Sequence, residues 1–199
     1  IYEYPFTSVR AETIRLEPSS EAEQTDLRTM LGIVEPQCLV AAGQFIDRKG
    51  FDVLIRAAAH LAEGVGVYII GGEPTTEYLA LREVVRASNV HFVGFQSADQ
   101  LRQYYASADL FVLPTREDIW GLVVNEAMAQ GLPVITTDRC GAGLAMVEDG
   151  VNGYVVRVDN EEAFVKTISG LLADEDLHAA MSQASLAVAR EFTIGKTPE

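Results

Sequence analysis

Cysteines, basic residues and long apolar runs are all scarce in this 199-residue chain, and each scarcity excludes a class of protein. Two cysteines, Cys38 and Cys140, are too few for a disulfide framework, and we expect buried, reduced thiols. Lysine and arginine number 15 against 29 acidic residues, and the net charge of −14 argues against nucleic acid or an anionic membrane as a partner. No apolar run reaches the ~18 residues of a membrane span, and no signal peptide is evident. These observations predict a cytoplasmic protein.

Motifs for metals and dinucleotide cofactors are also missing. The three histidines, His60, His91 and His178, are not at ligand spacing. The acidic run 174–176 is predicted to start a helix, because it lies between two helical patterns. The sequence 195–197 resembles the end of a phosphate-binding P-loop but lacks the first glycine and the preceding strand. No Gly-x-Gly-x-x-Gly follows the first predicted strand, so we expect neither a metal nor a cofactor.

The chain does contain a regular alternation of short apolar runs with helical patterns. The strands are expected at 38–42, 65–70, 90–93, 110–113, 134–137 and 154–156. The helices are expected near 21–31, 53–61, 78–86, 98–106, 120–130, 141–147, 161–172 and 177–191. Strands that alternate with helices require crossover connections, which predicts an α/β fold: a Rossmann-like, three-layer domain with a six-stranded parallel sheet.

The domain organisation is predicted to be simple. Residues 1–20 read as an irregular lead-in that docks onto the domain, and residues 21–199 as a single domain of ordinary size. The sequence starts at Ile1 rather than at a methionine, so we expect it to be a piece of a longer protein.

The segment 114–138 carries the richest pattern. A buried strand stops at Pro114, and a helical pattern then runs to Gly131 before the next strand. The amides of Ile119, Trp120, Gly121 and Leu122 are expected at the start of that helix, where the helix dipole favours an anion such as a diphosphate. Glu126, about one turn further on, could accept hydrogen bonds from ribose hydroxyls, with Asp118 at the mouth. A helix cap at Asp118 and a solvated Glu126 would explain the pattern equally well.

A second pattern follows the first predicted strand. Gly43-Gln44-Phe45 is followed by Arg48-Lys49-Gly50, which puts two cations at a turn before a helix. Lys49 would act as a point charge on a diphosphate, and Arg48 as a fork. A solvated basic pair is the plainer alternative.

Taken together, these segments resemble retaining, nucleotide-sugar-dependent glycosyltransferases of the B-type (GT-B) fold, specifically family 4. The family motif reads acidic residue, Gly-Phe-Gly-Leu, spacer, Glu-Ala-Met-Ala, Gly, Pro-Val. Here it reads Asp118-Ile-Trp-Gly-Leu122, then Glu126-Ala-Met-Ala129, Gly131 and Pro133-Val134. Lys49-Gly-Phe-Asp-Val-Leu54 matches a second family motif, and Gly71-Gly-Glu-Pro74 with Val93-Gly-Phe95 match two weaker ones. Four positions depart from the pattern: Gln44 for Arg, Asp118 for Glu, Ile119 for Gly and Ala145 for an acidic residue.

The resemblance implies a fold, an activity and separate domains for the donor and the acceptor. It covers about residues 30–190 and makes the domain 21–199 the C-terminal, donor-binding half, with residues 1–20 as interdomain linker. The N-terminal acceptor domain lies outside this chain, which alone should be inactive. The donor is implied to be a UDP- or GDP-sugar, used without a metal, and the acceptor a glycan or glycolipid, as in polysaccharide or glycolipid biosynthesis. The missing domain could place the enzyme peripherally on a membrane.

The resemblance also assigns residues. Lys49 and Asp118 are the predicted catalytic residues, for the diphosphate and the transferred sugar. Donor binding is expected to involve Gly43, Gln44, Arg48, Lys49, Phe95, Asp118, Ile119, Trp120, Gly121, Leu122 and Glu126, with Phe95 near the nucleobase. Two alternatives remain open: a nucleotide-sugar epimerase of the same fold, and a non-catalytic donor-binding domain.

Overall fold

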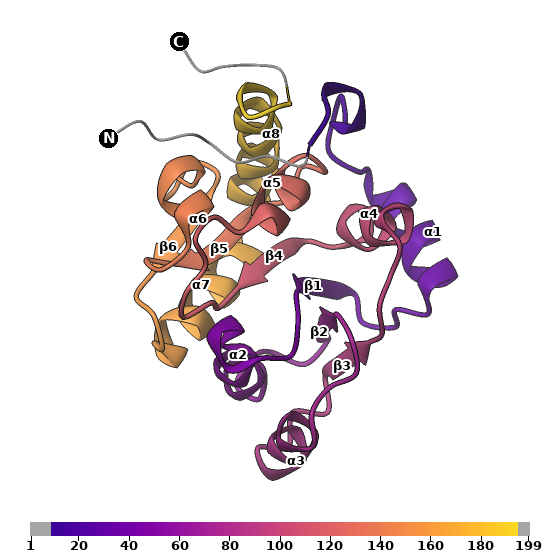
Figure 1. Ribbon diagram of the computed structural model, residues 1–199. Helices are drawn as coiled ribbons and strands as arrows, with labels where there is room; N and C mark the ends of the chain where they lie inside the picture. Colours follow the sequence, from indigo (N-terminus) through magenta and orange to yellow (C-terminus); the bar gives the residue numbers. More distant parts are fainter. Residues whose placement is uncertain (1–8, 195–199) are drawn as a thin grey trace.

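The computed structural model describes residues 9–194, which form one six-stranded parallel sheet between two layers of helices (Figure 1). The strands are β1 (Gln37–Ala42), β2 (Val65–Ile70), β3 (Val90–Val93), β4 (Leu110–Leu113), β5 (Val134–Thr137) and β6 (Gly153–Val156). Their spatial order is β3-β2-β1-β4-β5-β6, and every neighbouring pair is parallel. The predicted fold class is therefore confirmed, with strand bounds that differ by at most one residue.

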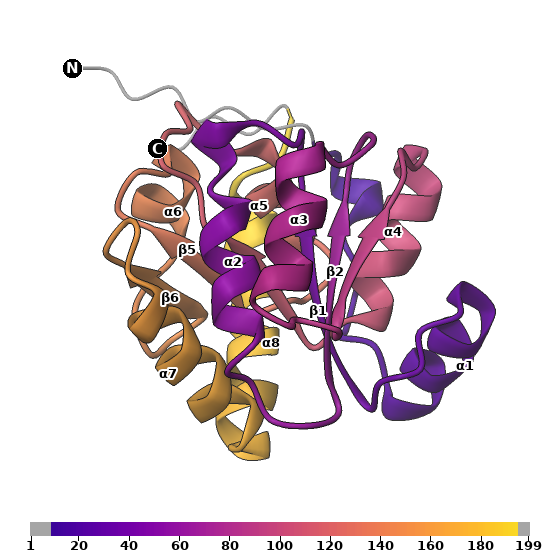
Figure 2. The same cartoon turned by 90° about the horizontal axis from the view of Figure 1, so that it is seen from below.

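The four central strands, β1, β2, β4 and β5, are almost entirely buried because helices cover both of their faces. The eight α-helices of the described chain are α1 (Glu21–Leu31), α2 (Phe51–Ala58), α3 (Thr76–Val84), α4 (Ala98–Ser107), α5 (Leu122–Met128), α6 (Gly141–Met146), α7 (Glu161–Leu172) and α8 (Glu175–Glu191). One core contains residues of α2, α3 and α7, and a second contains residues of α4, α5 and α6. Figure 2 shows α2 and α3 side by side in front of the strands. Continuous apolar strands are the expected consequence of this two-sided cover.

The helix ends follow capping chemistry. Ser20 accepts a hydrogen bond from the amide of Glu23, and Gly32, in the left-handed conformation, closes α1. Asp174 caps α8 by accepting from the amide of Leu177, so the acidic run 174–176 starts a helix as predicted. The prediction was less accurate for α2, which ends three residues before Leu61, where the chain turns toward β2.

The lead-in segment docks along one end of α5. Its described part, residues 9–20, contains the 3₁₀ turn η1 (Ala11–Thr13). The amide of Arg15 donates to the carbonyl of Ala129 at 3.0 Å, and the Gln130 side chain donates to the carbonyl of Thr13 at 3.0 Å. The expected docking of this segment is thus observed from residue 9 onward; residues 1–8 of the predicted linker lie outside the described range.

Candidate functional site

The candidate site lies where the loops after β1 and β4 meet. These strands are sheet neighbours, but the chain leaves β1 toward β2 on one side and continues from β4 toward β5 on the other. Ligands of open α/β sheets bind in the crevice that forms at such a switch point, outside the carboxyl ends of the strands. The predicted glycine–lysine turn follows β1, and the predicted acidic loop follows β4.

Lys49 and Asp118 meet directly where these two loops come together. Lys49 ends the 3₁₀ turn η2 (Asp47–Lys49), and its Nζ lies 2.5 Å from Oδ2 of Asp118. The two side chains are only 11% and 14% exposed. The two residues predicted to be catalytic, 69 positions apart in the sequence, are therefore brought into one ion pair. An ammonium held by a single carboxylate and largely shielded from water is suited to exchange that partner for an anionic ligand.

Glycines make this close approach possible. Gly50 has φ +65°, and a Cβ there would lie 2.1 Å from the carbonyl oxygen of Pro114, so the turn after β1 rests directly on the start of the β4 loop. Gly43 borders the Lys49 side chain, because a Cβ on Gly43 would lie 3.3 Å from Cε of Lys49. Gly43, which is predicted to take part in donor binding, therefore lies beside the Lys49 side chain.

The loop after Asp118 differs from the prediction in one respect. Helix α5 begins at Leu122, so Ile119 and Trp120 precede the helix rather than form its first turn. The reason is that the carbonyls around them bond to the neighbouring loop: the oxygen of Asp118 accepts from the amide of Gly141 at 3.1 Å, and that of Trp120 from the amide of Ala142 at 2.7 Å. Gly121, at φ +93°, then redirects the chain into the helix. Ile119 itself is 86% exposed beside Asp118.

Cys140 lies beneath this loop and not in a disulfide. Its Sγ donates to the carbonyl of Trp120 at 3.2 Å, and burial raises the pKa of the thiol. Cys38 is buried in β1, where burial likewise raises its pKa. Both are free cysteines, as the sequence predicted. They are inert packing groups, since the reactive species is the thiolate.

Glu126 faces a separate hollow of about 550 Å³ between α4, α5 and η1. Its lining includes Gln96, Leu101 and Tyr105 as well as Glu126. Tyr105 is buried, and its hydroxyl has no hydrogen-bond partner in the structure. Burial and the charge of Glu126 raise the pKa of Tyr105. Glu126 is attached to a helix on the opposite face of the sheet from α2, which follows Lys49.

The other predicted donor-binding residues lie around the same edge with different exposure. Gln44 and Arg48 are exposed, and Arg48 donates to the carbonyl of Glu117 at 3.2 Å. Phe95 is 86% exposed just after β3, near Gln96. An aromatic ring this exposed is available for stacking, and its place near a nucleobase stays a prediction.

Arg116 was missed by sequence reasoning. It lies two residues before Asp118 and donates to three aspartates, Asp47 and Asp52 in one stretch of the chain and Asp159 in another. An arginine directly after a strand, in a chain with few cations, was the available signal. Its partners are far away in the sequence, so their identity could not be read from it.

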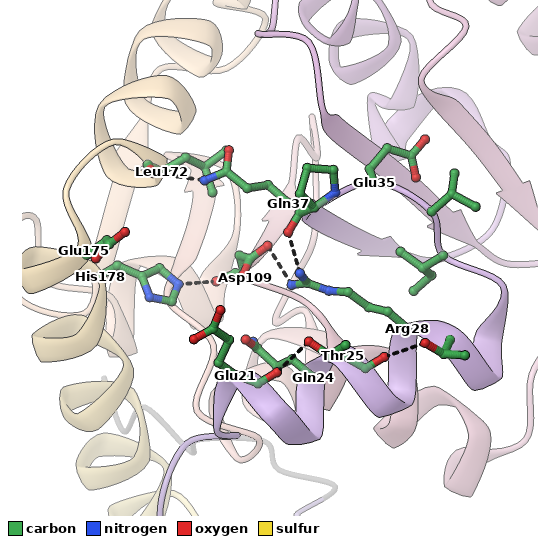
Figure 3. A pocket seen from close by; sticks show the side chains of 14 residues that line it. Glu21, Gln24, Thr25, Arg28, Glu35, Gln37, Asp109, Leu172, Glu175 and His178 are labelled. Atoms are coloured by element: carbon green, nitrogen blue, oxygen red, sulfur yellow. Dashed lines mark hydrogen bonds and ion pairs between the residues drawn. The ribbon is translucent and has the colours of Figure 1, made fainter.

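A second hollow, of about 510 Å³, lies at the amino ends of the strands (Figure 3). Its arginine, Arg28, is already engaged: Nη2 lies 2.8 Å from Asp109 Oδ2, and Nε donates to the carbonyl of Ser107. His178 points at the carbonyl oxygen of Asp109 from α8, at 2.7 Å. These groups tie α1, β4 and α8 together at the end opposite the candidate site.

Residues 9–194 contain neither a candidate metal cluster nor a candidate membrane-spanning helix. No group of three or more histidine, cysteine, aspartate or glutamate side chains among them could hold a metal ion. None of their helices combines the length and apolarity needed to cross a bilayer.

Comparison with known proteins places this geometry in a family. The family model described as "Glycosyl transferases group 1" matches residues 36–174, which is more than half of the chain. The lipopolysaccharide core biosynthesis glycosyltransferase LpsE of Rhizobium meliloti (strain 1021) is 34% identical over 147 residues, which are 73% of this chain and 42% of that protein. A GDP-mannose-dependent alpha-(1-6)-phosphatidylinositol monomannoside mannosyltransferase of Mycolicibacterium smegmatis is 33% identical over 185 residues, 87% of this chain and 48% of that protein.

Solved structures agree in fold. WaaG, a glycosyltransferase involved in lipopolysaccharide biosynthesis, matches with a TM-score of 0.79 and 25% identity over 95% of this chain and 55% of that one. Anabaena Alr3699/HepE, in complex with UDP and glucose, matches with a TM-score of 0.80 and 21% identity over 95% of this chain and 52% of that one. The chain spans less than half the length of the two curated relatives described above. Its sheet and helices match one half of GT-B glycosyltransferases, and the chain belongs to the group 1 glycosyltransferase family.

Proposed function

We propose that this chain is the donor-binding half of a retaining, family 4 glycosyltransferase that transfers a sugar from a nucleoside diphosphate to an acceptor hydroxyl. The observation that carries the proposal is the Lys49–Asp118 contact of 2.5 Å at the carboxyl ends of β1 and β4. One largely shielded ammonium and one carboxylate at this edge of the sheet match what such a donor needs: a cation for the diphosphate and an acceptor for sugar hydroxyls.

Each residue then has a specific task. Lys49 stabilises the charge that develops on the leaving diphosphate, aided by Arg48, by Gln44 and by the amides of the 119–122 loop. Asp118 accepts a hydrogen bond from the transferred sugar. In the described residues, the amides of Ile119 and Leu122 have no hydrogen-bond acceptor, which leaves them available for a ligand.

The nucleoside would extend toward α4. Glu126 accepts hydrogen bonds from the ribose hydroxyls in the hollow that it shares with Gln96. Phe95 covers the base. The donor is a UDP- or GDP-sugar: the mannosyltransferase relative is named as GDP-mannose-dependent, and the structural neighbour HepE was solved with UDP and glucose.

The reaction is mainly a matter of positioning. The bond between the anomeric carbon and the diphosphate oxygen breaks, the acceptor oxygen takes its place on the same face of the sugar, and the proton of the acceptor hydroxyl passes to the departing diphosphate. No metal is required in this proposal, because Lys49 supplies the counter-charge. The acceptor, a glycan or glycolipid, binds to a domain outside this chain, so residues 1–199 alone have no transferase activity. A cytoplasmic location is consistent with the two free thiols.

Thermal unfolding of the chain with UDP, GDP, ADP and their sugars tests the donor site. A ligand at 100 times its dissociation constant adds about 2.7 kcal/mol to the unfolding free energy. A stabilisation by one nucleotide and its sugar is expected, and no stabilisation by any of them would refute donor binding. Release of nucleoside diphosphate by the full-length protein with an acceptor separates a transferase from an epimerase or a non-catalytic domain, neither of which releases it in an acceptor-dependent way.

A further inference from the structure

Arg116 joins three segments that are distant in sequence. Its Nε lies 2.8 Å from Asp159 Oδ1 in the loop before α7, and its Nη2 lies 2.8 Å from Asp52 Oδ2 in α2. Its Nη1 donates both to the carbonyl of Asp47, at 2.8 Å, and to the carboxylate of Asp47, at 3.0 Å. Only the planar fork of a guanidinium can address several partners in fixed directions in this way.

The backbone next to Arg116 makes a second connection to the same turn. The carbonyl of Arg48 accepts from the amide of Arg116 at 2.7 Å and from the hydroxyl of Thr115 at 2.9 Å. The amide of Glu117 points at the same oxygen, at 3.3 Å. Arg48 is the residue before Lys49, and Glu117 is the residue before Asp118. The turn that presents the lysine is thus fastened to the loop that presents the aspartate.

Asp52 shows that this network is more than a set of exposed ion pairs. Burial alone would raise the pKa of Asp52, but its hydrogen bond from Arg116 and the charges of Arg116 and Arg56 outweigh that effect, and the pKa is lowered. The hydrogen bond to Asp52 in turn raises the pKa of Arg116. Arg116 is itself only 23% exposed. Asp159 adopts φ +56°, a left-handed conformation that is rare for a residue other than glycine and here aims its carboxylate at Arg116.

We propose that Arg116 is a positioning residue for the donor diphosphate: it holds the Asp47–Lys49 turn against the β4 loop so that the Lys49 ammonium is presented in the crevice. The inference rests on the proposed function of the site. Arg116 need not touch the ligand, because it acts through Lys49. Arg116 also offsets part of the negative charge that its three aspartate partners place next to a site that binds an anion.

Calorimetric titration of the chain with a nucleoside diphosphate and with the matching nucleoside tests this role. Arg116→Gln should weaken diphosphate binding about tenfold and change nucleoside binding less than about twofold, because only the phosphates use Lys49. In a Lys49→Gln background the Arg116 substitution should cause almost no further loss. Equal weakening of both ligands, or an undiminished loss in the Lys49→Gln background, would overturn the proposal. Arg116→Lys should restore little, since an ammonium cannot reach all three partners.

A matched control and a ligand-free measurement complete the design. Arg28→Gln removes an equally engaged arginine at the other end of the sheet and should leave diphosphate affinity unchanged. Amide hydrogen exchange should show lost protection at positions 116 and 117 in Arg116→Gln, with the strands unchanged. Retained protection there would refute the positioning role even if no nucleotide binds. A wild-type chain that binds no nucleotide, with protection lost in the variant, would instead refute the proposed function and keep the fastening role.

Discussion

Replacing Asp118 by asparagine should change the stability of the chain and its affinity for a diphosphate in opposite directions. Asparagine has nearly the same shape and keeps an acceptor oxygen, but it removes the charge that faces the ammonium at 2.5 Å. In the unliganded chain the pair contributes stability, because both side chains are largely shielded from water. When a diphosphate binds, it must take the place of that carboxylate. The substitution therefore lowers stability and should raise the affinity for a bare nucleoside diphosphate.

The size of both effects follows from the contact. A hydrogen bond to a charged group contributes about 1.5–3 kcal/mol, and asparagine keeps part of it, so a loss of about 1 kcal/mol is expected. For a chain of this length, that corresponds to a melting temperature lower by about 2–4 °C. The same free energy no longer opposes the ligand, so the diphosphate should bind about fivefold more tightly. With a nucleotide sugar the gain disappears, because Asp118 is then missing from the sugar hydroxyl.

Thermal unfolding and calorimetric titration of both proteins give these numbers. The decisive quantity is the ratio of the dissociation constants for the nucleotide sugar and for the bare diphosphate, which should rise in Asp118→Asn. If the variant binds the bare diphosphate more weakly than wild type, the carboxylate is not displaced by the ligand, and the assignment of Lys49 to the diphosphate is wrong.

Three further predictions concern the same architecture. Gly50→Ala should lower the free energy of unfolding by about 3 kcal/mol or more, because its Cβ would lie 2.1 Å from the carbonyl oxygen of Pro114 at a positive φ. The control Gly170→Ala, in open space on α7, should raise it by about 0.5–1 kcal/mol in the same urea titration. A similar change for both variants would refute the close packing at Gly50. Glu126→Gln should weaken a nucleoside diphosphate about tenfold but leave its 2′,3′-dideoxy analogue unaffected, and an equal loss for both would remove Glu126 from the ribose role. The free energy of unfolding should fall as the pH drops below about 4.5. The carboxyls of Glu35 and Asp52 have folded-state pKa values lowered from 4.5 and 3.8. The stability that they contribute is therefore present above those values and is lost as the folded protein takes up the protons. Glu35→Gln should flatten that slope; an unchanged slope would exclude Glu35, whose partners Tyr68 and His91 hold it at 2.6 Å.

The fold was predictable because each strand coincides with a short apolar run in the sequence. Six apolar runs of four to six residues, each followed by a helical pattern, leave little choice but a parallel sheet. Helix ends were predictable where a cap residue marks them, as at Ser20 and Gly32. The end of α2 was not, because nothing in its apolar spacing signals that residues 59–61 turn toward β2.

The sequence resemblance named residues of the candidate site, but it did not give the contacts between their side chains. The resemblance named Lys49 and Asp118, and parallel topology explains why loops after β1 and β4 meet. Their ion pair, however, depends on side-chain directions across 69 residues, which no local pattern encodes. The same holds for Arg116, whose partners come from two distant stretches of sequence, residues 47–52 and Asp159. The start of α5 moved because the carbonyl of Trp120 bonds to the amide of Ala142, a long-range contact that overrides the local helical pattern.

The most direct test of the central claim is a crystal structure of the chain with the nucleoside diphosphate that stabilises it most. We predict a phosphate oxygen within hydrogen-bond distance of Lys49 Nζ, the Lys49–Asp118 contact opened, and the ribose hydroxyls on Glu126. An intact Lys49–Asp118 pair with the nucleotide bound elsewhere would contradict the account.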